Sequence, residues 1–213
     1  MTLPERDCSP FLTTICMSDI LCVTNRSLCN DDFLMRIEQI AKAKPHGIIL
    51  REKELCESEY IDLARRVKNI CEEYDVMCIL HSFKKAAYEL NIRAIHMPLP
   101  HLQSMSTEEK AFFTHIGASC HSLEEAREAQ SLGCTYITVG HIFATDCKKG
   151  LPPRGIDFLQ KICNGVSIPV FAIGGIDAEN IQSIRNAGAA GACVMSGIMR
   201  CQDTEKYIRR LGG

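Results

Sequence analysis

Short apolar runs rich in β-branched residues alternate with amphipathic segments along the chain, and this alternation constrains the fold more than any other feature of the sequence. The patterns predict strands at residues 20–24, 47–50, 76–80, 94–97, 115–119, 136–139, 170–173 and 192–195. They predict helices at residues 31–43, 58–74, 83–90, 107–113, 123–132, 155–163, 178–187 and 204–211. Repeated β-then-α units indicate an α/β protein, a single (β/α)8 TIM barrel over residues 1–213. An open doubly wound sheet stays the alternative, because periodicity does not show closure.

The composition agrees with one well-packed domain. The 213 residues are 46% hydrophobic and 23% charged, with a net charge of −2 and dispersed lysines and arginines. We therefore expect no nucleic-acid partner. No apolar run approaches the roughly 18 residues that a membrane helix needs, and residues 1–10 lack the apolar core of a signal peptide. A cytoplasmic protein without a membrane partner is expected.

The 13 cysteines form no CxxC pair, and their number is odd. Most lie inside apolar runs, so we interpret them as small buried hydrophobes in a reducing compartment and expect no metal site. Cys120 and Cys147 fall in candidate functional loops, where a reactive thiol stays open.

In a barrel, the segments that follow the strands meet at one face, where such proteins keep their chemistry. Glycines follow the last two strands, in Gly174-Gly175 and in Met195-Ser196-Gly197. Backbone amides there, and the start of a short helix, predict a phosphate site; two tight turns are the simpler interpretation.

Arg51 and Lys53 follow the second strand, with Glu52 between them. Alternation places both cations on one side of an extended segment, where they can bind phosphate, pyrophosphate or carboxylate. Ion pairs with Glu52 or Glu54 are an equal alternative. Lys148 lies in a long glycine-bounded loop after the sixth strand and can also reach a ligand.

His121 follows the fifth strand, just before Ser122 and Glu125, which have capping-box spacing. An imidazole there can move protons near neutral pH. A structural histidine bonded to a loop carbonyl is as common in such a position. His81, His96 and His141 are further acid–base candidates, although a structural role is more common for any one of them.

Together these loops resemble the thiamine phosphate synthase superfamily. The resemblance covers nearly the whole chain and is carried by REK at residues 51–53, SCHSLEEA, VGHIFATDCKKGLPPRG, IPVFAIGGI and AGAAGACVMSGI. The family includes a magnesium-dependent synthase, which couples a pyrimidine pyrophosphate to a thiazole phosphate, and a thiazole tautomerase of the TenI type.

Departures from the synthase pattern favour the tautomerase: GHIFATDCKKG has His141 where the synthase has proline after the glycine, and two further departures are more decisive. The synthase's asparagine–aspartate after the third strand is replaced by His81-Ser82, and its HxGQxD motif is replaced by His96-Met97-Pro98-Leu99-Pro100-His101. The magnesium carboxylates are therefore absent. We expect an isomerase that aromatises a dihydrothiazole carboxylate phosphate in thiamine biosynthesis, with synthase activity or a non-catalytic thiazole- or thiamine-phosphate-binding regulator as alternatives.

The resemblance implies His121 as the catalytic residue. It implies a substrate site made of Arg51, Lys53, His81, Ser119, Thr145, Cys147, Lys148, Gly174, Gly175, Met195, Ser196 and Gly197, without metal or cofactor. The expected partners are a small phosphorylated thiazole, thiazole synthase and a second copy in a homodimer.

Overall fold

The computed structural model describes residues 19–212, which form a closed barrel of eight parallel strands in sequential order. This confirms the predicted barrel and excludes the open sheet. The strands are β1 (Ile20–Val23), β2 (Gly47–Leu50), β3 (Met77–His81), β4 (Ala94–Pro98), β5 (His115–Cys120), β6 (Tyr136–Gly140), β7 (Val170–Ile173) and β8 (Gly191–Val194). The predicted single domain was given residues 1–213, which reach beyond the described residues. The prediction that residues 1–10 lack the apolar core of a signal peptide also lies outside them.

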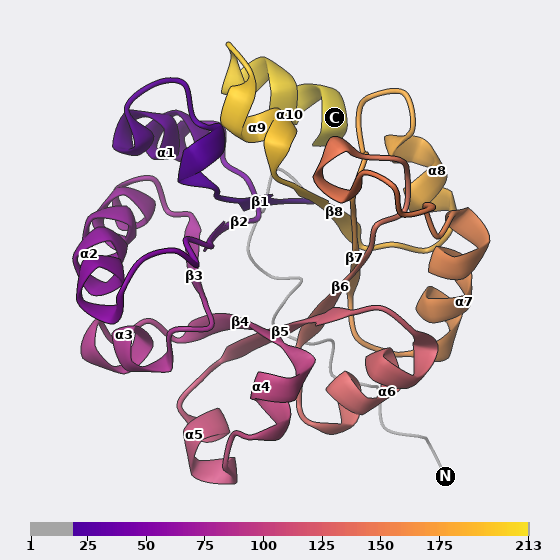
Figure 1. Cartoon of the computed structure of the whole chain (residues 1–213), viewed down its shortest axis with the longest axis horizontal. Coiled ribbons are helices and arrows are strands. Elements are labelled where there is room, and N and C mark those ends of the chain that lie inside the picture. The colour runs from indigo at the N-terminus through magenta and orange to yellow at the C-terminus, as the bar shows by residue number, and fades with distance from the viewer. Residues whose placement is uncertain (1–18, 213) are drawn as a thin grey trace, which may run out of the picture.

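Helices form a ring outside the strands (Figure 1). They are α1 (Phe33–Lys42), α2 (Glu57–Glu73), α3 (Lys84–Glu89), α4 (Leu99–Gln103), α5 (Thr107–Ala111), α6 (Leu123–Ser131), α7 (Ile156–Gly165), α8 (Ile181–Asn186), α9 (Ser196–Arg200) and α10 (Thr204–Gly212). Two short 3-10 helices, η2 (Arg26–Leu28) and η3 (Asp146–Lys148), lie in the loops after β1 and β6.

Strand alternation sorts the apolar side chains into two cores. One fills the barrel lumen, with Leu21, Val23, Ile49, Ile79, Ala94, Tyr136, Phe171 and Cys193. The larger one lies between the strands and the helices and includes Ile20, Cys22, Ile48 and Leu50. Neighbouring strand residues thus enter different cores, which explains why these strands read as continuous apolar runs.

Most predicted elements are confirmed within one or two residues, and the largest difference is at α8. This helix begins at Ile181 rather than at residue 178, because Asp177 and Asn180 form a local turn. Asp177 Oδ1 accepts from the amides of Glu179 and Asn180, and Asn180 Oδ1 accepts from the amide of Asp177. The segment 98–100 is also not a simple loop, since Pro98 ends β4 and Leu99 begins α4.

The described cysteines are free thiols; five of the eleven are buried, four are partly buried and two are exposed. Burial raises the pKa of Cys120 to about 12, which argues against a reactive thiolate there, whereas Cys147 is exposed. Between residues 19 and 212, no helix is long and apolar enough to cross a membrane.

Candidate active site

All eight strands are parallel, so the segments that follow them lie at the same end of the barrel. We call this end, formed by the segments directly after β2, β3, β5, β6, β7 and β8, the rim. Each predicted site residue lies in one of these segments or in the last residues of its strand. The structure therefore brings to one face residues that are up to about 150 positions apart in the chain.

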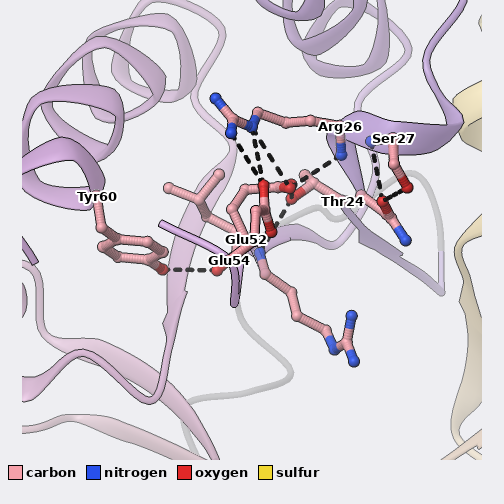
Figure 2. A network of polar contacts seen from close by, with 9 residues as sticks. Thr24, Arg26, Ser27, Glu52, Glu54 and Tyr60 are labelled. Atoms are coloured by element: carbon pink, nitrogen blue, oxygen red, sulfur yellow. Dashed lines mark hydrogen bonds and ion pairs between the residues drawn. The ribbon is translucent and has the colours of Figure 1, made fainter. Parts of the chain in front are cut away.

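The segment after β2 is held by a buried carboxylate. Glu52 is only 1% exposed, and it accepts hydrogen bonds from the Thr24 hydroxyl and from the amide of Arg26, the latter at 2.9 Å (Figure 2). Arg26 also pairs with Glu54, at 3.0 Å from Nη2 to Oε1. Both acidic neighbours of the cations thus face Arg26.

Arg51 and Lys53 consequently stand apart from carboxylates. Among residues 19–212, neither side chain has a carboxylate oxygen within 4.0 Å, so the ion-pair alternative for this segment is wrong. Burial lowers the pKa of Lys53, and the charges of Arg51 and Lys148 lower it further. Three cations from the loops after β2 and β6 therefore share one region of the rim.

Two buried imidazoles lie beside these cations. The rings of His81 and His96 stack with their centroids 5.9 Å apart, at the ends of β3 and in β4. Burial lowers the pKa of each to about 3, with the charge of Arg51 adding to the effect on both. Both histidines are therefore neutral at physiological pH and can accept or donate one hydrogen bond at each ring nitrogen.

His96 connects the lumen to the rim. Its Nδ1 lies 3.1 Å from the Tyr136 hydroxyl, and its Nε2 lies 2.9 Å from Ser119 Oγ. Thr138 Oγ1 is 3.4 Å from the same Ser119 oxygen. Ser119 is half-buried near the end of β5, and these contacts orient its hydroxyl from inside the barrel.

His121 is exposed at the start of the segment after β5. Its amide donates to Glu125 Oε2 at 2.6 Å, and its Nδ1 lies 3.2 Å from the carbonyl oxygen of Gly140. A carbonyl can only accept, so Nδ1 carries a proton in this contact, and in the neutral form of the ring Nε2 is then the acceptor. The contact to a loop carbonyl is the structural role that the sequence left open, and it is compatible with an acid–base function.

The β6 loop is fixed to the β7 segment at its base and exposed at its tip. The amides of Ile142 and Phe143 donate to the carbonyls of Ile173 and Gly174, at 2.9 and 3.0 Å. Thr145 caps η3 by accepting from the amide of Cys147 at 3.4 Å. Lys148 follows in this exposed turn and reaches the region of Lys53.

Packing within the protein already requires the rim glycines. Gly174 and Gly175 have φ of +99° and +67°, and a Cβ on Gly175 would lie 2.4 Å from the Ala144 carbonyl oxygen. A Cβ on Gly197 would lie 2.0 Å from the Tyr207 hydroxyl. The glycines therefore have a structural cause, and the phosphate site predicted between them, Met195 and Ser196 stays a prediction.

A magnesium ion fits these residues poorly. The ends of β3 and β4 hold His81-Ser82 and Pro98-Leu99, which supply no carboxylate, whereas magnesium prefers oxygen ligands and usually takes one or two carboxylates. Within the described residues, no group of three or more His, Cys, Asp or Glu side chains is arranged to hold a metal ion.

Several residues with a role in this geometry had no place in the sequence prediction, among them Thr24, Arg26 and Tyr136. Thr24 links the ends of β1 and β2, and Tyr136 is the lumen partner of His96. Thr24 ends a predicted strand and Tyr136 begins one. The apolar patterns around them predict the strands, and they do not predict the hydrogen bonds of these two side chains. A polar residue at a strand end is the signal that could have found Thr24.

The fold and the rim define a (β/α)8 barrel whose rim carries the cations Arg51, Lys53 and Lys148. The sequence pattern of the family described as thiamine monophosphate synthase matches residues 20–198. The chain is 34% identical to the thiamine-phosphate synthase of Fusobacterium nucleatum over 196 residues, which cover 90% of this chain and 94% of that protein. It is 34% identical over 198 residues to the thiamine-phosphate synthase of Syntrophomonas wolfei, with coverage of 89% and 92%.

Among solved structures, the thiamine phosphate pyrophosphorylase from Pyrococcus furiosus resembles this chain with a TM-score of 0.79 at 26% identity. The alignment covers 92% of this chain and 94% of that one. The chain therefore belongs to the thiamine monophosphate synthase family.

The relatives overturn the expectation of a thiazole tautomerase. Those described above carry the name of the synthase, a transferase, so the assignment as an isomerase was wrong. The reason is physical. The absence of carboxylates at His81-Ser82 and Pro98-Leu99 predicts a weaker affinity for magnesium. It does not by itself identify another reaction.

Proposed function

We propose that this protein is a thiamine-phosphate synthase, which joins a phosphorylated pyrimidine to a phosphorylated thiazole. The proposal is supported by relatives that are 31–34% identical over most of the chain and bear that name. The observation that carries it in the structure is the group of three cations, Arg51, Lys53 and Lys148, without acidic partners among the described residues. A pyrophosphate leaving group needs such charge.

The roles follow from position. When the bond from the pyrimidine to its pyrophosphate breaks, negative charge grows on the departing oxygens, and Arg51, Lys53 and Lys148 can stabilise it electrostatically. Ser119 can donate its single hydroxyl proton to the same group when Nε2 of His96 donates to Ser119 Oγ and Nδ1 of His96 accepts from the Tyr136 hydroxyl. The segments with Gly174, Gly175, Met195, Ser196 and Gly197 would hold the thiazole phosphate.

His121, His81, Thr145 and Cys147 complete the proposed binding site around the substrates. His121 presents Nε2 as an acceptor, and neutral His81 avoids adding positive charge next to Arg51. No step of this proposal passes through a metal, because the donors after β3 and β4 do not suit magnesium.

The test is a direct synthesis assay. Purified protein is incubated with the pyrimidine pyrophosphate and the thiazole phosphate, and thiamine phosphate and pyrophosphate are measured together by chromatography. Equal amounts of both products in the wild type, with a loss in Arg51→Ala, support the proposal. Absence of thiamine phosphate with and without added magnesium contradicts it.

One observation favours a second candidate, a phosphate-ligand-binding regulator without turnover. The missing carboxylates would impair catalysis more than binding, since three cations still suit an anion. Tight binding of thiazole phosphate without product formation would support this candidate. The unpaired cysteines fit a reducing compartment such as the cytoplasm, while thiazole synthase and a second copy as partners stay predictions.

A further inference from the structure

The cations after β2 project from a segment whose own backbone needs support. Arg51 and Lys53 follow the last residue of β2 and belong to neither a strand nor a helix. Long basic side chains in such a segment would turn toward the nearest carboxylates, which here are their chain neighbours Glu52 and Glu54. Instead, both acids face Arg26, from the loop after β1.

A chain of hydrogen bonds explains this arrangement. The Arg51 amide donates to Thr24 Oγ1 at 3.0 Å, and the Thr24 hydroxyl in turn donates to Glu52 Oε1. The other carboxylate oxygen of Glu52 accepts from the amide of Arg26 at 2.9 Å. One carboxylate thereby ties the ends of β1 and β2 together (Figure 2).

We propose that buried Glu52 is a positioning residue of the proposed anion-binding site at the rim. Through Thr24 it fixes the backbone of residues 51–53, and this backbone sets the direction of the Arg51 and Lys53 side chains. The inference deepens the proposed function, because it rests on an anion binding at this rim. We call the set Thr24, Arg26 and Glu52 the clasp.

The clasp makes a prediction with an unusual sign. Glu52 is a carboxylate between two cations in the chain, and its negative charge repels an anion bound there. Coulomb repulsion alone therefore predicts that removing the charge of Glu52 should tighten the binding of an anion. A positioning role predicts the reverse, since the cations lose their fixed direction when the clasp opens. The two explanations of Glu52 are therefore separated by the direction of the change in affinity.

The experiment measures the binding of inorganic pyrophosphate to the full chain by calorimetry. Glu52→Gln is expected to weaken binding about tenfold, the loss of one well-placed charge-assisted contact. Glu54→Gln is the matched control: it removes the same charge from the exposed partner of Arg26 and leaves the Arg51–Thr24–Glu52 chain intact. Unchanged or slightly tighter binding is expected for the control.

A double-mutant cycle assigns the effect to the cations. In an Arg51→Ala background, Glu52→Gln should change pyrophosphate affinity less than about twofold, because the side chain that it positions is gone. Tighter binding in Glu52→Gln, or an equal effect with and without Arg51, would overturn the inference. So would a wild type that does not bind pyrophosphate.

A second pair of variants covers the case in which Glu52→Gln does not fold. Thr24→Val removes the linking hydroxyl at nearly the same volume, and Thr24→Ser restores it. Weaker pyrophosphate binding in Thr24→Val but not in Thr24→Ser supports the clasp, and equal affinity in both contradicts it. The readout is binding, so a negative result in the synthesis assay would refute the proposed function without affecting the clasp.

Discussion

Ser119 Oγ at the rim lies 2.9 Å from Nε2 of His96, whose other ring nitrogen is 3.1 Å from the hydroxyl of Tyr136 in the lumen. The orientation of a rim hydroxyl is thus set by a neutral imidazole inside the barrel. Through this contact His96, although buried, can influence a residue at the rim.

Replacing Ser119 tests whether this hydroxyl contacts the anion. Ser119→Ala should weaken pyrophosphate binding by about 10-fold to 100-fold, because a hydrogen bond to a charged group contributes about 1.5–3 kcal/mol. Calorimetry measures the affinity, with Ser131→Ala on the exposed end of α6 as the control. Wild-type affinity in Ser119→Ala would remove this residue from the site.

The lowered pKa of His81 predicts a dependence of stability on pH. Between about pH 6.5 and 3, the unfolded chain binds a proton at this imidazole that the folded chain does not, so stability rises with pH and is lost as the pH falls. Each such histidine contributes about 1.4 kcal/mol per pH unit in this window. His96 acts in the same direction.

Urea denaturation between pH 4.5 and 7.5 checks this. His81→Gln should flatten the dependence by about one proton relative to the wild type. The control is His101→Gln, which removes an imidazole that is exposed in the folded protein. Parallel curves for the wild type and His81→Gln would contradict the assignment of a neutral buried His81.

Anion binding should not depend on magnesium. The segments at His81-Ser82 and Pro98-Leu99 offer no carboxylate, so the affinity for pyrophosphate or thiazole phosphate is expected to change less than about threefold between magnesium and chelator. Calorimetric titration under both conditions measures this. A large loss of affinity in chelator would show that other groups recruit the metal.

Gly117 in β5 should tolerate no larger side chain, because it packs against His96 and Tyr136. A Cβ there would lie 2.1 Å from Tyr136 Cζ and 2.5 Å from His96 Nδ1. Gly117→Ala is therefore expected to destabilise the fold by about 3 kcal/mol or more, at the upper end of overpacking effects. Gly47→Ala is the matched strand control, since its nearest neighbour is the flexible Ile79 Cδ1 at 3.1 Å.

Thermal and urea unfolding measure both glycine variants. A smaller loss of stability in Gly117→Ala than in Gly47→Ala would mean that Tyr136 and His96 can move aside. In that case, the lumen network is looser than its hydrogen bonds indicate.

The sequence determined the alternating β and α units, because alternation of short apolar runs with amphipathic segments is a local property of the chain, whereas closure of the sheet into a barrel was decided by the tertiary structure. It also placed Arg51, Lys53 and Ser119 on the rim, since residues at strand ends share one face of a parallel barrel. The start of α8 was missed because the turn at Asp177 and Asn180 competes with the first helical turn.

Contacts between distant segments were decided only by the tertiary structure. The sequence left Glu52 as a partner for Arg51 or Lys53, yet closure of the barrel brings Thr24 and Arg26 to it from β1 and leaves the cations without acids among the described residues. The same closure buries His81 and His96 and makes them neutral. Burial and long-range hydrogen bonds depend on which strands meet, and local patterns do not contain that information.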